Sequence, residues 1–274
     1  MTLLTVNKLN LSLIQQHRRV PVLKDISLDI IKGETLGVVG ESGSGKSMLM
    51  RSLLGVLPGD PALTFEHFHF DGNDIPQDAA LTMRPHMAMV LQDPKTSLNP
   101  VMTVEDQIKE AFILQGEKND LNKRALKSLE EVSIDDGERV LKSYPFELSG
   151  GMGQRVMIAM MLALKPKLLI ADEPTSALDA HVQNQILELL KEKATEHNMT
   201  LVMVSHDLPL VSKYCDRVAV MYQGRIVETC TAQDLSKSAH PYTKGLLGCL
   251  PTLQEKRARL SVLDRSLLEQ EMPS

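Results

Sequence analysis

The sequence has few aromatic residues and few cysteines. Among its 274 residues there are no Trp, four Tyr, five Phe and three Cys. Cys215, Cys230 and Cys249 are too far apart in the sequence to form a metal-binding or redox motif. An odd number of cysteines is typical of a protein from a reducing compartment. We therefore predict buried free thiols rather than a disulfide framework or a zinc site.

Long apolar runs are also missing. The longest unbroken run, residues 156–164, has nine residues, whereas a helix that spans a bilayer needs about 20. The first five residues, MTLLT, lack the basic region followed by an apolar core that is typical of a signal peptide. We expect no signal peptide and no membrane-spanning segment, so that any role at a membrane would be peripheral.

No charge of one sign dominates the chain. The formal net charge is −5, from 30 Lys and Arg against 35 Asp and Glu. This balance argues against a broad surface for polyanions, and we expect no nucleic-acid partner. Hydrophobic residues make up 43% of the chain and charged residues 24%, which is typical of a globular protein with a sizeable core. The length allows one large domain or one domain with insertions.

One glycine-rich stretch, GESGSGKS, matches the phosphate-binding pattern G-x-x-x-x-G-K-[ST]. It lies between an apolar run, residues 35–39, that predicts a buried strand and a breaker-free run, residues 47–54, that predicts a helix. Its glycines allow backbone N–H groups to turn toward phosphate oxygens. Lys46 would reach the β- and γ-phosphates, and Ser47 would bind Mg²⁺. A glycine-rich turn that binds nothing is the disfavoured alternative. The predicted cradle consists of Gly40, Glu41, Ser42, Gly43, Ser44, Gly45, Lys46 and Ser47.

Three further predicted strands end in polar side chains. Asp172 ends one of them and would hold Mg²⁺, while Glu173 would orient and polarise the attacking water as a base. His206 follows the next strand and could hydrogen-bond the γ-phosphate. Gln92 follows an earlier strand and could touch Mg²⁺ or a water. Because ligands of parallel α/β sheets lie beyond the carboxyl ends of the strands, we expect these residues to gather at one edge.

A second glycine-rich segment, Leu148–Gly151, precedes an apolar helical run at residues 156–164. Ser149, Gly150 and Gly151 at a helix N-terminus form a second arrangement suited to an anion. The preceding residues, from about 95, are richer in Lys and Glu and predict two amphipathic helices, 103–115 and 120–132. We interpret this region as a helical insertion, either a solvated decoration or a docking surface for a partner.

The remaining segments predict an antiparallel sheet and a tail. Alternating residues at 3–13, 22–30 and 67–70 favour strands beside the nucleotide site. His67 and His69 would share one face of a strand, and with no third ligand evident an exposed strand face is favoured over a metal site. Residues 217–222 and 225–229 predict a hairpin. From about residue 236 the chain is polar and helix-prone.

Together these motifs resemble the ATP-binding subunits of ABC transporters. Within that superfamily the segments 92–104, 144–152 and 240–247 are similar to the peptide/opine/nickel importer family, and 139–147 is closer to its nickel- and metallophore-importing members. The matching elements are Walker A at Gly40–Ser47, the Q-loop Gln92, the signature Leu148–Gly151, Walker B at Leu168–Asp172 with Glu173, the D-loop Ser176–Asp179 and the switch histidine His206.

The resemblance implies an α/β fold: a RecA-like P-loop NTPase core with an antiparallel β subdomain and an inserted helical subdomain. An ABC ATPase domain would span residues 1–235, with the helical insertion at about 95–152, and a C-terminal helical appendage would span 236–274. ATP and Mg²⁺ are the implied cofactors, and Lys46, Glu173 and His206 the catalytic residues. The signature would cover ATP held by a second ATPase subunit, identical or homologous, in a head-to-tail dimer.

The implied function is a transport ATPase on the cytoplasmic face of the inner membrane. Its partners would be permease subunits and, indirectly, a substrate-binding protein. The cargo stays open between nickel, a metallophore, a peptide and an opine. A soluble ATPase that remodels nucleic acid or ribosomes is the alternative, disfavoured by the single cassette and the short insertion. An inactive scaffold is disfavoured by the intact Glu173 and His206.

The chain departs from the family pattern at two places. Leu13 stands where many members have an aromatic residue that stacks on adenine, and His17 is the only ring in the residues that follow it. What contacts adenine is therefore open, with His17 as one possibility. Peptide-importing members often end in a cysteine-rich extension that resembles an iron–sulfur site. Here only Cys249 lies in the tail, so we expect no cluster.

Overall fold

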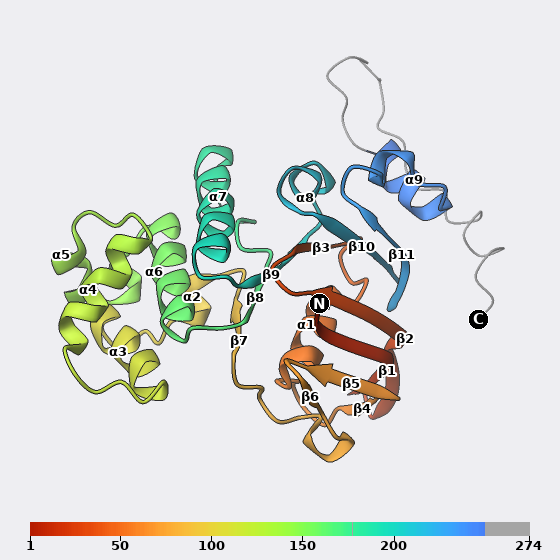
Figure 1. Ribbon diagram of the computed structural model, residues 1–274, viewed down its shortest axis with the longest axis horizontal. Coiled ribbons are helices and arrows are strands. Elements are labelled where there is room, and N and C mark those ends of the chain that lie inside the picture. Colours follow the sequence, from red (N-terminus) through yellow and green to blue (C-terminus); the bar gives the residue numbers. More distant parts are fainter. Residues whose placement is uncertain (177, 250–274) are drawn as a thin grey trace.

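A six-stranded sheet crosses the centre of the protein in the order β11-β10-β3-β9-β8-β7 (Figure 1). The computed structural model describes residues 1–176 and 178–249. Five neighbouring strands run parallel, and β11 pairs with β10 antiparallel at the edge. The strands are β3 (Thr35–Val39), β7 (Met87–Val90), β8 (Leu168–Asp172), β9 (Thr200–Ser205), β10 (Arg217–Tyr222) and β11 (Arg225–Thr231).

The parallel strands are short apolar runs because both of their faces are covered. Every residue of β3, β7 and β8 is buried. The edge strand β11 is mostly half-buried. Their parallel direction brings the ends of β3, β7, β8 and β9, and therefore the residues that follow them, to one edge of the sheet.

A second, antiparallel sheet has five strands, in the order β2-β1-β5-β6 with β4 paired to β1. Leu4, Val6, Leu9 and Leu11 of β1 are fully buried, which agrees with the predicted alternation. Their side chains share one hydrophobic core with helix α1 and one face of the parallel sheet. The elements are β1 (Thr2–Gln15), β2 (Arg18–Ile31), α1 (Lys46–Leu54), β4 (Ala62–Thr64), β5 (His67–Phe70) and β6 (Asn73–Asp74).

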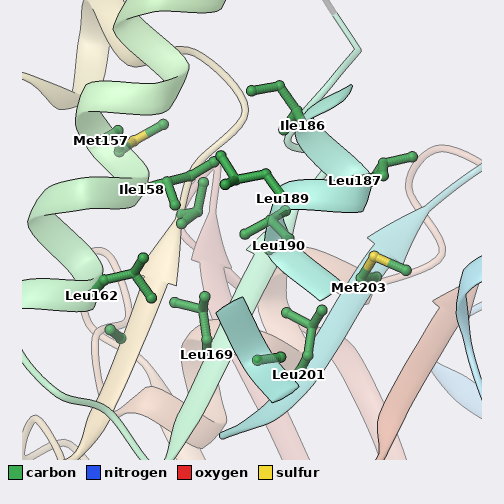
Figure 2. Packing of buried hydrophobic residues seen from close by; sticks show 14 of the residues in the cluster. Met157, Ile158, Leu162, Leu169, Ile186, Leu187, Leu189, Leu190, Leu201 and Met203 are labelled. Atoms are coloured by element: carbon green, nitrogen blue, oxygen red, sulfur yellow. The ribbon is translucent and has the colours of Figure 1, made fainter. Parts of the chain in front are cut away.

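A group of helices between β7 and β8 stands at one side of the central sheet, on the left of Figure 1. Helix α7 connects β8 to β9, and helix α8 connects β9 to β10. Figure 2 shows Ile158 and Leu162 of α6 in the same core as Leu189 and Leu190 of α7, above Leu169 and Leu201 of the sheet. The helices are α2 (Pro94–Ser97), α3 (Val104–Leu114), α4 (Leu121–Glu131), α5 (Gly137–Lys142), α6 (Gly150–Ala163), α7 (Ala180–Glu196) and α8 (Leu208–Tyr214), with short 3₁₀ turns at Gln77–Ala79 and Pro145–Glu147.

The predicted fold class is confirmed, and one helix boundary is corrected. Helix α6 begins at Gly150, six residues before the predicted run, because the Ser149 side chain accepts a hydrogen bond from Met152 N and caps the helix there. Helix α1 ends at Leu54, as the predicted run 47–54 does, because Gly55 turns left-handed with φ 83°. The two amphipathic helices of the insertion are confirmed as α3 and α4.

The tail returns to the central sheet through a 3₁₀ turn, Leu235–Lys237, and helix α9 (Pro241–Gly248). Most of the predicted appendage, from residue 250 on, lies outside the described residues, and the boundary at 235 stays a prediction. Cys215 is buried, and burial raises its pKa to about 12, whereas Cys230 and Cys249 are only partly buried. The prediction of buried thiols therefore holds for Cys215 alone. Within the described residues, every helix is too short or too polar to cross a membrane.

Candidate nucleotide site

The glycine-rich loop lies between β3 and α1, close against β10. A Cβ atom on Gly40 would lie 2.2 Å from the carbonyl oxygen of Met221, so the loop passes too near that strand for any side chain. Gly45 has φ 104° and forms the entry to α1. The Ser44 hydroxyl is buried without a hydrogen-bond partner in the part of the chain that the structure describes. This unpartnered hydroxyl, in a loop that has no room for a side chain at Gly40, fits a bound phosphate.

Lys46 begins α1 and folds back over the loop. Its Nζ donates hydrogen bonds to the carbonyl oxygens of Gly40, at 2.8 Å, and of Glu41, at 3.0 Å. Burial lowers the pKa of Lys46, while the nearby carboxylates of Asp172 and Glu173 act in the opposite direction. A desolvated ammonium group beside a glycine loop is placed to bind phosphate oxygens.

Oxygen atoms that suit Mg²⁺ converge beside Lys46. The Ser47 hydroxyl, in the first turn of α1, donates to Asp172 Oδ1 at 3.0 Å, at the end of β8. Gln92, which follows β7, lines the same cavity as Ser47 and Glu173. Burial raises the pKa of Asp172, and a bound cation would favour its charged form. Hydroxyl, carboxylate and amide oxygens are ligands that Mg²⁺ prefers, so these residues fit the ion.

Glu173 and His206 form a pair at the next position along the same edge. Glu173 follows β8 with φ 47°, and its backbone N–H donates to Val204 O at 3.0 Å. His206 follows the neighbouring strand β9, and its Nδ1 lies 3.3 Å from Glu173 Oε1. Both side chains line a second cavity, beside the one at the glycine loop. The parallel pairing of β8 with β9 therefore brings together two residues that the sequence separates by more than thirty positions.

The signature segment lies elsewhere. Ser149, Gly150 and Gly151 form the beginning of α6, and Ser149 and Gly151 line a cavity with Val182 of α7 that includes no residue of the glycine loop. The structure thus divides the predicted site residues into two groups. The first holds Gly40, Glu41, Ser42, Gly43, Ser44, Gly45, Lys46, Ser47, Gln92, Asp172, Glu173 and His206, and the second holds Ser149, Gly150 and Gly151.

Val22 and Tyr242 contact the loop region without having been predicted to do so. Val22, from β2, lines the cavity at the loop together with Lys46, whereas Leu13 and His17 are not among its lining residues. Tyr242 of α9 had no predicted role, yet its hydroxyl oxygen accepts a hydrogen bond from Glu41 N at 3.1 Å. A single tyrosine two hundred residues away from the loop carries no local pattern, so only the fold could reveal this contact.

The parallel sheet, the glycine loop and the acidic strand end define a P-loop ATPase cassette. Residues 23–176 match the family described as ABC transporter, and the chain belongs to that family. It is an ATP-binding, ATP-hydrolysing transport subunit.

Curated relatives match nearly the whole chain. The dipeptide transport ATP-binding protein DppD of Escherichia coli is 42% identical over 270 residues, which cover 96% of this chain and 83% of that protein. The oligopeptide transport ATP-binding protein AppD of Bacillus subtilis is 39% identical, covering 97% and 84%. The chain is therefore similar to the ATP-binding subunits of peptide transporters.

Solved structures share the fold. The structure of cbiO1 from Clostridium perfringens, part of the ABC transporter complex cbiONQ, has a TM-score of 0.73 at 29% identity and covers 86% of this chain and 91% of its own. The dimeric ATP-binding cassette MJ0796 bound to ADP and Pi has a TM-score of 0.72 at 26% identity, covering 84% and 98%.

Proposed function

We propose that this chain energises the uptake of short peptides as one of two ATPase subunits bound to a permease on the cytoplasmic face of the inner membrane. The observation that carries the proposal is the division of the site. The glycine loop, Asp172, Glu173 and His206 lie together, while Ser149–Gly151 lies apart at the start of α6. A triphosphate held by the first group would need the second group from another subunit.

In the proposed mechanism the loop residues hold the triphosphate. The backbone N–H groups of the loop and the start of α1 face the phosphates. Lys46 exchanges its bonds to the carbonyls of Gly40 and Glu41 for bonds to phosphate oxygens. Ser47 and Asp172 would hold Mg²⁺ with Gln92. The ion supplies charge neutralisation on the phosphate oxygens.

Glu173 and His206 act on the hydrolysis step. Glu173 accepts a hydrogen bond from the attacking water, orients it and takes its proton as the water adds to the γ-phosphorus. The bond from the γ-phosphorus to the β–γ bridging oxygen breaks in the same step, so that ADP leaves and inorganic phosphate forms. His206, whose Nδ1 lies 3.3 Å from that carboxylate, donates a hydrogen bond to the γ-phosphate. The partner's copy of the signature helix would add N–H donors on the opposite side of the γ-phosphate. Closure of the dimer would then depend on an intact triphosphate, and hydrolysis would release it.

The helical region α2–α6 is proposed to transmit this closure. Its helices form one group connected to the core through β7 and β8. The Gln154 side chain, in α6, donates to Leu91 O at 3.3 Å, next to Gln92. A shift of α6 would therefore move Leu91 and, with it, the neighbouring Gln92 beside the nucleotide. Docking of this region on the permease would convert closure into transport.

The names of the relatives favour a peptide as cargo. Nickel or a metal chelate is the second candidate, supported by the similarity of residues 139–147 to nickel- and metallophore-importing members. The test is reconstitution of the chain with its permease, second ATPase subunit and substrate-binding protein in vesicles. We expect ATP-dependent uptake of labelled dipeptide and no uptake with a Glu173→Gln chain. Uptake of labelled nickel without dipeptide uptake would overturn the peptide assignment, and a lack of both would overturn the importer function.

A further inference from the structure

We propose that the β5–β6 hairpin holds a site for a divalent first-row transition-metal ion, built from His67, His69 and Asp74. One ligand atom from each of these residues lies within 4.8 Å of the other two. The sequence prediction favoured an exposed strand face because no third ligand was evident. Asp74 supplies that ligand, from the strand that pairs with β5.

The local fold explains why these three side chains meet. Phe68 and Phe70 of β5 are buried in the core, so the alternation of the strand sends His67 and His69 to the opposite face. The two imidazole rings lie nearly parallel, at 15°, with centroids 6.1 Å apart. The tight turn that follows pairs His69 with Asp74 across the hairpin. The same face therefore carries two histidines and a carboxylate.

The distances are close to those of a bound ion. Asp74 Oδ1 lies 2.9 Å from His69 Nδ1 and 3.8 Å from His67 Nε2. Ligand atoms bound at the usual Zn–N and Zn–O lengths of about 2.0–2.2 Å lie about 3–3.5 Å apart around a tetrahedral ion. Small side-chain rotations would bring all three atoms to that spacing.

The donor set selects the kind of metal. Two imidazoles and one carboxylate suit zinc, nickel or copper, whereas Mg²⁺ and Ca²⁺ prefer oxygen ligands alone. The side chains of His67 and His69 are 48% and 34% exposed, which leaves a path for the ion and room for water as a further ligand. None of the three residues lines the cavity at the glycine loop, so this site is distinct from the Mg²⁺ ligands of the nucleotide site.

Equilibrium dialysis of the full chain against Zn²⁺ tests the site, with Mg²⁺-ADP in excess to occupy the nucleotide site. We expect one Zn²⁺ per wild-type chain, and at least about tenfold weaker binding after His69→Ala or Asp74→Asn, since even the residues behind metal ligands change affinity by 10–100-fold. The control His197→Ala changes an exposed histidine at the end of α7 and should bind Zn²⁺ like the wild type.

Unchanged ATPase rates in these variants would show that the fold is intact. Co²⁺ absorption bands that appear in the wild type and the control, and disappear in both site variants, would establish that the ion is coordinated at these residues. Equal Zn²⁺ binding by wild type and the His69 and Asp74 variants would overturn the proposal. So would wild-type binding no stronger than that of a His67→Ala, His69→Ala chain.

A second observation carries an independent inference: we propose that Tyr242 is a positioning residue for the glycine loop. Its hydroxyl accepts the hydrogen bond from Glu41 N, and its ring is fully buried with its centroid 4.4 Å from that of Tyr222. Tyr242 lies in helix α9, and Glu228 of β11 anchors that helix and the residues before it. Glu228 Oε2 accepts hydrogen bonds from Ser238 and from Thr243 of α9, both at 2.5 Å. The tail thereby fixes the backbone next to Gly40.

Substitution of Tyr242 by Phe removes the hydroxyl and keeps the ring. Loss of one backbone hydrogen bond corresponds to about a twofold to tenfold change in an equilibrium constant. We expect the KM for ATP and the Kd for a fluorescent ATP analogue to rise by that factor, with kcat nearly unchanged. Tyr214→Phe is the matched control, since Tyr214 is also buried but bonds through its hydroxyl to Asn184 on α7.

This inference rests on the proposed role of the loop in ATP binding, which the wild-type titration tests in the same experiment. An unchanged Kd in the Tyr242 variant overturns the positioning role while leaving ATP binding intact. An equal rise in the Tyr214 variant does so as well, because it would reflect a general loosening of the fold. Absence of wild-type binding would instead overturn the function of the loop.

Discussion

The two glycine-rich segments of this chain are built in different ways. The loop at Gly40–Gly45 has glycines at φ 155°, 81° and 104° and is pressed against the backbone of β10. Gly150 and Gly151, in contrast, lie in the first turn of α6, and a Cβ on Gly151 would come 2.9 Å from a methyl group of Val182. The first needs glycine for its backbone shape, and the second for close packing of α6 on α7.

The difference teaches how the site is divided. Lys46 bonds back to the loop, and the loop lies beside Asp172, Glu173 and His206, so one chain brings together the groups to which we assign binding and chemistry. The start of α6 exposes backbone N–H groups of a first helical turn, which have no acceptor within their helix. Ser149 and Gly151 line a cavity that includes no residue of the loop, so in the proposed function this helix start would serve a phosphate that another chain holds.

The largest expected effect is that of Glu173→Gln on the ATPase rate, which tests whether the residues beside the glycine loop carry out hydrolysis. Loss of the base should lower the ATPase rate by about 10²–10⁴-fold, while ATP binding persists because the loop is untouched. Phosphate release and binding of an ATP analogue measure the two quantities separately. Glu138→Gln, an exposed acid on α5, is the control and should behave as the wild type. A wild-type ATPase rate for the Glu173 variant would mean that Glu173 is not the base for hydrolysis.

A smaller effect is expected from Lys46→Ala. Removal of a charged donor to phosphate should weaken ATP binding by about tenfold to a hundredfold, equivalent to about 1.5–3 kcal/mol. Equilibrium titration with a fluorescent ATP analogue measures the change. Lys123→Ala on α4 serves as the matched loss of a surface lysine. Equal affinities for the Lys46 variant and the wild type would mean that the loop does not grip the triphosphate.

Of the three substitutions, Ser149→Ala should have the smallest effect on a chain that has not dimerised. Loss of this N-cap should lower the free energy of unfolding by about 1 kcal/mol, and ATP affinity at concentrations below dimerisation should stay unchanged. The ATPase rate of the assembled dimer should nevertheless fall. Chemical denaturation, ATP titration and phosphate release measure the three quantities.

Thr103→Ala is the matched control for this variant. The Thr103 hydroxyl caps α3 in the same way, accepting from Asp106 N at 3.2 Å. The Thr103→Ala substitution should lower the free energy of unfolding by a similar amount and leave the ATPase rate unchanged. Weaker ATP binding in the undimerised Ser149 variant would contradict the division of the site, because it would place the signature at the nucleotide of its own chain.

The sequence was sufficient for residues that follow recognisable strands. Asp172 and His206 end or follow short apolar runs, and parallel pairing then dictates that they meet at one edge. The antiparallel strands and helices α3 and α4 were likewise predictable from the period of their apolar residues. In these cases the apolar residues that recur with a regular period in the sequence are the same residues that the fold buries.

Contacts that depend on distant segments were not predictable. Even the nearby Asp74 was missed, because it meets His69 only through the pairing of β6 with β5, which the sequence pattern did not predict. Tyr242 reaches Glu41 because the tail folds back over β10 and β11. The short elements β4, β6, α2, α5 and α8 were also missed, since too few residues lie in each to show a period.

The backbone of Glu173 has a consequence for how this enzyme can change over time. A residue other than glycine at φ 47° carries an energetic penalty of about 1 kcal/mol or more. Drift to glycine would relieve that penalty, so selection on thermal robustness alone would tend to erase the carboxylate. The proposed role of Glu173 as the base accounts for a carboxylate at a position where the main chain favours glycine, because a glycine could not polarise the water.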